Sequence, residues 1–220
     1  QLHVNKGGIG TYTEEYEKRG FPFRDFLLKL ILVIVLTTQI KFSFASTKEN
    51  LENLDKGIQS EAAVIIEETT GKVIYDRNSN EKKYPASTTK IMTALLLCEM
   101  GDLNKEITVT VEMLRVEGSS MGLLAGDRVT LYDLLYGMML ASGNDAANVT
   151  AYVLGGTVSG FVKKMNEKAA ELGLKNTNFV TPSGLDAPEH YTTARDLAKL
   201  AAYAMKNEHF AKAAASQSAT

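Results

Sequence analysis

The apolar residues of the chain follow a strand pattern first and a helical pattern afterwards. Two short runs rich in Val and Ile, residues 62–68 and 72–76, stand on either side of Thr69-Thr70-Gly71. Such runs around a glycine-containing turn predict a β-hairpin. Beyond residue 86 the apolar positions recur three and four residues apart, which predicts helices. The predicted helices cover residues 87–100, 131–140, 144–154, 159–172 and 194–206, and a short strand is predicted over 106–111.

Signals at the helix ends support these boundaries. Gly101 and Gly173 each follow a predicted helix, where a glycine is typical. Thr130 and Asp133 have the spacing of a capping box with Asp in place of Glu, and Thr193 is expected to cap the last helix. Because a two-stranded sheet is marginal alone, we expect further strands outside these 220 residues. The predicted fold class is α/β of the α+β kind: an antiparallel sheet, incomplete here, flanked by helices.

The first 45 residues differ from the rest of the chain. Residues 1–25 are polar and glycine-rich, and we treat them as an N-terminal extension without a predicted fold. Basic residues then precede the apolar run Leu30–Leu36, and Ser43-Phe44-Ala45 ends the segment. This order predicts a signal peptide over residues 26–45, and hence an exported protein of the cell envelope. A transmembrane anchor is the alternative, but the apolar run is far shorter than the ~20 residues that a span needs.

Composition narrows the function classes. Apolar residues make up 45% of the chain and charged residues 23%, as in an ordinary globular domain. The formal net charge is −2 without a basic cluster, so a nucleic-acid partner is not expected. The single cysteine, Cys98, cannot form a disulfide within the chain and is interpreted as a small core residue. The three histidines lack zinc-ligand spacing, so we expect neither a metal site nor a cofactor.

The pattern Ser-x-x-Lys occurs twice, and its context separates the two copies. Ser79 and Lys82 lie in a polar segment that we interpret as a solvated loop. Ser87 and Lys90 stand at the start of a predicted amphipathic helix, where a spacing of three places them on one face. A serine there can attack a carbonyl if a lysine with a lowered pKa takes its proton. The alternative is that Ser87 only caps the helix and that Lys90 is solvated.

A second polar motif, Ser142-Gly143-Asn144, falls at the break between two predicted helices. A hydroxyl there can pass a proton to a leaving amine, and an amide can bind a peptide bond. The alternative is a helix that ends at Gly143, with Asn144 as the next N-cap. Gly118-Ser119-Ser120-Met121-Gly122 matches the nucleophile elbow of α/β-hydrolases, but a turn follows it instead of a helix, so we interpret it as a loop.

Three other polar residues receive structural interpretations. Asp145 and Asp196 each lie at the start of a predicted helix and are interpreted as charges that favour the helix N-terminus. His190, in Pro188-Glu189-His190-Tyr191, is interpreted as a turn residue.

The two motifs belong to a series along the chain: Thr70–Val73, Pro85–Leu95, Gly118–Gly122 with Gly126-Asp127, Ala141–Ala147, Thr181–Leu185 and Tyr191–Ala198. This series, which covers about residues 60–207, resembles the serine D-alanyl-D-alanine carboxypeptidases, the low-molecular-mass penicillin-binding proteins. The resemblance implies that residues 60–220 are the N-terminal part of a penicillin-binding, β-lactamase/transpeptidase-like catalytic domain with a helical subdomain.

The resemblance also implies roles for single residues. Ser87 would attack the penultimate D-Ala carbonyl of a peptidoglycan stem peptide and form an acyl-enzyme that water hydrolyses. Lys90 would accept the proton of Ser87, Ser142 would relay a proton to the departing D-Ala, and Asn144 would bind the substrate amide. β-Lactam antibiotics would acylate the same serine.

The family's third motif, Lys-Thr-Gly on a late strand, does not occur in residues 1–220. We expect the chain to end before this motif, and before the C-terminal β-domain and membrane-surface anchor that relatives often carry. We therefore predict that residues 47–220 alone are inactive and form no stable adduct with labelled penicillin. Two alternatives stay open: a class A-like β-lactamase, which carries Ser-Asp-Asn in place of Ser142-Gly143-Asn144, and a non-catalytic cell-wall-binding protein of the same fold.

Overall fold

The computed structural model describes residues 55–218. The chain divides into two compact units, residues 1–59 and 60–220, and every labelled element lies in the second. The predicted extension (residues 1–25) and signal peptide (residues 26–45) lie outside the described residues and stay predictions. Within the described range, no helix combines the length and the apolar character that a membrane crossing requires.

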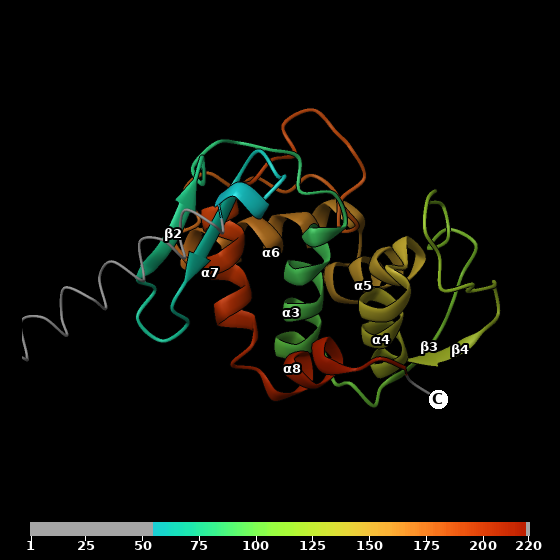
Figure 1. Ribbon diagram of the computed structural model, residues 1–220. Helices are drawn as coiled ribbons and strands as arrows, with labels where there is room; N and C mark the ends of the chain where they lie inside the picture. The colour runs from blue at the N-terminus through green and yellow to red at the C-terminus, as the bar shows by residue number, and fades with distance from the viewer. Residues whose placement is uncertain (1–54, 219–220) are drawn as a thin grey trace, which may run out of the picture. The chain divides into compact units, whose positions relative to one another are not determined.

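Helices make up most of the second unit, and its strands form two small antiparallel sheets (Figure 1). The strands are β1 (Ala63–Ile66), β2 (Val73–Arg77), β3 (Glu106–Thr108) and β4 (Arg128–Thr130). The helices are the 3₁₀ turn η1 (Ala86–Thr89), α3 (Lys90–Met100), α4 (Leu131–Ala141), α5 (Asn144–Gly155), α6 (Val158–Glu171), α7 (Ala194–Ala204) and α8 (Glu208–Ala215). Helices with small antiparallel sheets are the predicted architecture.

The predicted hairpin is formed by β1 and β2. The strands are antiparallel, with Ile65 opposite Tyr75, and their register shifts at the end of β1. The Glu67 carboxylate accepts the backbone N–H groups of Thr69 at 2.9 Å and Thr70 at 2.6 Å. β1 is therefore shorter than the predicted 62–68, because Glu67 serves the turn instead of the strand.

Helix α3 is the centre of the unit. Residues Met92–Leu97 are all buried, and the helix contacts α4, α5, α6, α7 and α8. Figure 1 shows α3 between α7 on one side and α4 and α5 on the other. The prediction of an amphipathic helix is therefore wrong, because neighbouring helices cover α3 on several sides. Cys98 is half-buried and packs against this core, and burial raises the pKa of its thiol to about 12, as fits a core residue.

The predicted helix-end signals hold with one exception. Thr130 Oγ1 accepts the Asp133 N–H at 3.1 Å, and the Asp133 carboxylate accepts the Thr130 N–H at 2.7 Å, which completes the capping box. Gly173 follows α6 with a left-handed φ of +67°. Gly101 ends α3 with φ −90°, so left-handed freedom is not its role. A Cβ there would lie 2.7 Å from the Leu97 carbonyl oxygen, so this position needs glycine for space.

Two elements have no counterpart in the prediction. β4 pairs with β3, with Val129 opposite Ile107, and its three residues are too few to show an alternating pattern. α8 is capped by Asn207, which accepts the N–H of Phe210 at 3.2 Å, and it buries Phe210 and Ala213. The three-residue spacing of that apolar pair is the signal from which α8 was predictable.

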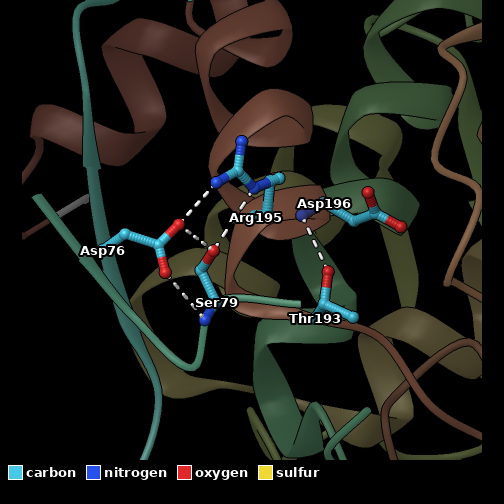
Figure 2. A network of polar contacts seen from close by, with 5 residues as sticks. All are labelled: Asp76, Ser79, Thr193, Arg195 and Asp196. Atoms are coloured by element: carbon cyan, nitrogen blue, oxygen red, sulfur yellow. Dashed lines mark hydrogen bonds and ion pairs between the residues drawn. The ribbon is translucent and has the colours of Figure 1, made fainter. Parts of the chain in front are cut away.

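A polar network joins the end of β2 to the start of α7 (Figure 2). Arg195 donates to the Asp76 carboxylate and, from Nε, to Ser79 Oγ at 3.3 Å, while Ser79 Oγ donates to Asp76 at 2.6 Å. Ser79 is only 1% exposed, so its interpretation as part of a solvated loop is wrong. Lys82 lies over the Tyr191 ring, 3.9 Å from its centroid. This Ser-x-x-Lys copy is thus structural.

Asp196 is a buried residue at the start of α7 that hydrogen-bonds to a distant segment of the chain. Its carboxylate accepts the Asn176 N–H at 2.8 Å and the Thr177 hydroxyl at 2.9 Å. Its own N–H donates to Thr193 Oγ1 at 3.1 Å, the predicted cap (Figure 2). The interpretation of Asp196 as a helix-start charge is therefore incomplete, because the carboxylate also ties residues 176–177 to α7.

Candidate active site

Ser87 lies in the 3₁₀ turn η1, which leads directly into α3. The turn begins at Ala86, whose φ of +47° is left-handed, and the Pro85 carbonyl accepts both the N–H and the hydroxyl of Thr88, at 3.2 and 2.5 Å. The α-helix begins at Lys90, three residues later than predicted. Residues three apart stand above one another in a 3₁₀ turn, so η1 places Lys90 beside Ser87.

The Lys90 side chain is 3% exposed, and oxygen atoms from three segments surround its amine. Nζ donates to the Ser183 carbonyl at 2.9 Å and lies 3.2 Å from Ser87 Oγ and 3.4 Å from Ser142 Oγ. Burial lowers the pKa of Lys90 to about 8, although the negative charge of Asp145 acts in the opposite direction. The alternative of a solvated lysine is therefore excluded, and at pH 7 roughly one amine in ten is uncharged.

The Ser142-Gly143-Asn144 motif forms the predicted break between two helices. The helix end and the next N-cap each lie one residue earlier than the alternative interpretation placed them. Ser142 ends α4 in the left-handed conformation with φ +54°, Gly143 is the N-cap of α5, and Asn144 is the first residue of α5. Left-handed backbone at a non-glycine residue costs free energy and often marks functional sites. This turn is the place from which the Ser142 hydroxyl reaches Lys90.

Asn144 is 5% exposed and holds the neighbouring loop. Its Nδ2 donates to the Glu117 carbonyl at 2.7 Å, and its backbone N–H donates to the Ser119 carbonyl at 2.7 Å. A Cβ at Gly118 would lie 2.5 Å from Asn144 Nδ2, so the loop approaches the amide as closely as glycine allows. The structure thus brings Ser87, Lys90 and Ser142 together. Asn144 lies two residues after Ser142 and is bonded to the neighbouring loop.

The buried Asp145 carboxylate orders the same loop from the start of α5. It accepts the Ser120 hydroxyl at 2.5 Å and the backbone N–H groups of Met121, Gly122 and Leu123 at 3.0, 3.1 and 3.1 Å. Burial opposes the ionisation of Asp145, but these hydrogen bonds outweigh it and keep the pKa below its usual range. Asp145 is therefore a loop clamp as well as a helix-start charge, and the Gly-x-Ser-x-Gly segment is a loop, as predicted.

Asp145→Asn is expected to destabilise the protein by about 3 kcal/mol, because an amide replaces a charged acceptor of several buried N–H groups. Hydrogen exchange measured by NMR should show faster exchange at Met121, Gly122 and Leu123. The matched control is Asp127→Asn, since Asp127 accepts one loop N–H, that of Leu124, at 2.8 Å. Unchanged protection at residues 121–123 in Asp145→Asn would show that the carboxylate does not hold the loop.

Sequence reasoning missed the third side of the site, the 180–185 segment. Here the Ser183 carbonyl accepts from Lys90, and the Pro182 carbonyl accepts the Thr93 hydroxyl at 2.6 Å. Gly184 has φ +89°, and a Cβ there would lie 1.8 Å from the Ala86 carbonyl oxygen. The Pro-Ser-Gly sequence signals a turn, but nothing in it identifies a backbone carbonyl as the partner of a lysine.

Gly184→Ala is expected to lower the free energy of unfolding by about 3 kcal/mol, through left-handed strain and a clash with backbone beside Ser87. Gly126→Ala separates the two effects, because Gly126 has φ +97° with nothing within 4 Å of the added Cβ. That control should cost only about 1 kcal/mol in urea unfolding. Equal losses for both variants would contradict the close packing of Gly184 on Ala86.

Comparison with known sequences and structures assigns the family. The family model described as D-alanyl-D-alanine carboxypeptidase, Peptidase_S11, matches residues 47–219. The carboxypeptidase DacF of Bacillus subtilis is 40% identical over 191 residues, which cover 84% of this chain and 49% of that protein. DacB2 of Mycobacterium tuberculosis is 40% identical over 158 residues, which cover 71% of this chain and 54% of that protein. The chain therefore spans about half the length of the curated relatives it matches.

Solved structures agree with this assignment. A D-alanyl-D-alanine carboxypeptidase from Mycobacterium tuberculosis superposes with a TM-score of 0.70 at 38% identity, covering 73% of this chain and 61% of that chain. Penicillin-binding protein 6B from Escherichia coli gives 0.71 at 33% identity, covering 74% and 55%. These likenesses confirm the predicted β-lactamase/transpeptidase-like fold with an incomplete sheet. The chain therefore belongs to the D-alanyl-D-alanine carboxypeptidase family, Peptidase_S11.

Proposed function

We propose that the protein is a serine-type carboxypeptidase that removes the terminal D-Ala from peptidoglycan stem peptides through an acyl-serine intermediate. The observation that carries this proposal is the buried Lys90 amine, 3.2 Å from Ser87 Oγ and 3.4 Å from Ser142 Oγ. A serine becomes a nucleophile when a neighbouring base takes its proton, and a desolvated lysine can be that base near neutral pH. Membership of the family supports the choice of substrate.

In the proposed reaction, Ser87 Oγ attacks the carbonyl carbon of the penultimate D-Ala, and its proton passes to the neutral Lys90 amine. The backbone N–H of Ser87 donates to the developing oxyanion, an interaction worth about 3 kcal/mol in other acyl-transfer sites. The C–N bond then breaks, and the departing D-Ala amine takes a proton from Lys90 through the Ser142 hydroxyl. Water hydrolyses the acyl-serine and restores Ser87.

Asn144 is the proposed binding group for the substrate amide. Its carboxamide is held by the Glu117 carbonyl, which fixes its orientation before a substrate arrives. An amide side chain offers two protons and one acceptor oxygen, so the bond to Glu117 leaves further capacity for a peptide. A β-lactam would react with Ser87 by the same attack, which opens the ring amide and leaves a slowly hydrolysed acyl-serine.

The alternative functions have weaker support. A class A-like β-lactamase would carry Ser-Asp-Asn, whereas this chain has Ser142-Gly143-Asn144, and the matched relatives are named carboxypeptidases. A non-catalytic wall-binding protein would gain nothing from burying the amine of Lys90, because burial of a charged group costs stability. A substrate in the cell wall also accords with export by the signal peptide that we predict over residues 26–45.

The proposal is tested by D-Ala release from a stem pentapeptide, measured on the full-length gene product. We expect release of D-Ala, and labelled penicillin attached to Ser87 in peptide mass spectrometry. Hydrolysis of penicillin much faster than of the pentapeptide would favour the β-lactamase alternative. No release and no adduct would favour the non-catalytic one.

A further inference from the structure

The imidazole of His190 is buried, although the residue follows a turn in the chain. It is 1% exposed, and its ring meets Phe179 edge-on with centroids 5.9 Å apart. The backbone fits the turn interpretation, since the His190 N–H donates to the Ala187 carbonyl at 3.0 Å. The side chain does not fit it, because it points into the protein. The proposed reaction gives this imidazole no role.

Both ring nitrogens of His190 bind other segments. Nδ1 accepts the backbone N–H groups of Val180 at 3.0 Å and Thr181 at 3.2 Å, and Nε2 lies 2.9 Å from Thr89 Oγ1. Because Nδ1 is an acceptor, the ring proton is on Nε2 and is donated to the Thr89 hydroxyl. Burial lowers the pKa of His190, against the effect of the Asp186 charge, so the ring stays neutral. The imidazole is thus a neutral bridge between the 180–185 segment and the residue before Lys90.

The 180–185 segment carries the groups that cover the Lys90 amine. The Ser183 carbonyl accepts from Lys90 Nζ at 2.9 Å, and the Pro182 carbonyl accepts from Thr93, one turn further along α3. Both carbonyls directly follow Thr181, whose N–H the imidazole holds. The charged group that acts on Lys90 is Asp145, which lies in the first turn of α5 and not in the 180–185 segment. Loss of the segment would therefore expose the amine to water without removing its charged neighbour.

We propose that His190 is a positioning residue for the proposed acylation: it fastens the 180–185 segment to the start of α3 and so keeps the Lys90 amine covered. It is not a base, since its Nδ1 is occupied by two N–H groups and its Nε2 already carries the proton. The role of His190 in acylation rests on the proposed function. Its attachment of the 180–185 segment to the start of α3 is a property of the folded chain and does not depend on that proposal.

The test is an NMR titration of Lys90 in the full chain labelled with ¹³C-lysine, which needs no turnover. The wild-type amine should titrate near pH 8. In His190→Ala the segment detaches and water reaches Nζ, so the midpoint should rise toward the ordinary value of 10.5, by at least about one pH unit. His190→Asn keeps an acceptor for the two N–H groups and should restore most of the wild-type value. His209→Ala, which removes an exposed imidazole on α8, should change nothing.

A His190→Ala protein that folds and keeps the wild-type titration midpoint of Lys90 would overturn the inference. Loss of a residue with only a structural role would lower the free energy of unfolding and leave this midpoint unchanged. If His190→Ala does not fold, Thr89→Val removes the other end of the bridge and should raise the midpoint in the same direction; no rise would then reject the inference. The expected shift together with a full-length protein that releases no D-Ala would reject the proposed function alone.

Discussion

Ser87→Ala is expected to abolish covalent labelling by penicillin and to slow D-Ala release by about 10⁴-fold or more, because alanine has no hydroxyl oxygen with which to form the acyl bond. The variant should fold normally, since Ser87 is exposed and surface substitutions usually change the free energy of unfolding by less than about 0.5 kcal/mol. The measurements are gel fluorescence with labelled penicillin and D-Ala release from a stem pentapeptide, both on the full-length gene product.

The control for Ser87→Ala removes a hydroxyl that the proposed chemistry does not use. Ser159 is exposed near the start of α6, where its Oγ lies 3.1 Å from Thr157 Oγ1. Ser159→Ala should label and release D-Ala at the wild-type rate. Penicillin attached to another serine in Ser87→Ala, or undiminished D-Ala release, would show that Ser87 is not the nucleophile.

Lys90→Met is expected to slow acylation by about 10²–10⁴-fold, the range that general base catalysis usually contributes. Methionine is a flexible apolar side chain that can occupy much of the same buried space, but it cannot accept the Ser87 proton. In the wild type, the second-order rate constant for penicillin acylation should rise with pH through about 8, where the Lys90 amine loses its proton. The variant should lack this rise in a pH–rate profile.

Lys90→Met should also raise the free energy of unfolding, and the gain should be largest below about pH 8, where the wild-type lysine is charged. The Lys90 pKa is about 8 in the folded chain, whereas an ordinary lysine, as in the unfolded chain, has a pKa of 10.5, so the unfolded chain binds more protons between these values. Stability contributed by this group therefore rises with pH from 8 to 10.5, and below 8 the folded state bears the full cost of a buried charge. The difference corresponds to about 3 kcal/mol, so the advantage of Lys90→Met should shrink by about that amount between pH 7 and 10.5.

Urea unfolding at pH 7 and at about pH 10 measures this effect, and Lys163→Met is the control. Lys163 is an exposed residue of α6 with 79% of its side chain accessible, so its removal should change the free energy of unfolding by less than about 0.5 kcal/mol. A pH-independent difference between wild type and Lys90→Met would mean that the amine is not desolvated, and the proposed base would lose its support.

Local spacing accounts for what the sequence alone could predict. The Ser87–Lys90 contact, the Thr130–Asp133 capping box and the β1–β2 hairpin all join residues that are close along the chain. Backbone geometry sets such contacts, so they follow from residue type and spacing without knowledge of the fold. The helix break at Ser142-Gly143-Asn144 was predictable for the same reason, although the observed cap residues, Ser142 and Gly143, precede the expected ones by one residue.

The tertiary structure alone decided that Lys90 is a buried amine. Its partner Ser183 is 93 residues away, the imidazole that bonds Thr89 is 101 residues from Thr89, and the loop groups that donate to Asp145 lie more than 20 residues upstream. Most of these partners are backbone carbonyl and N–H groups. Every residue type provides a carbonyl, and every type except proline provides an N–H, so no sequence pattern identifies these partners. Burial of α3 likewise depends on how five other α-helices pack around it, and that packing is a property of the whole fold.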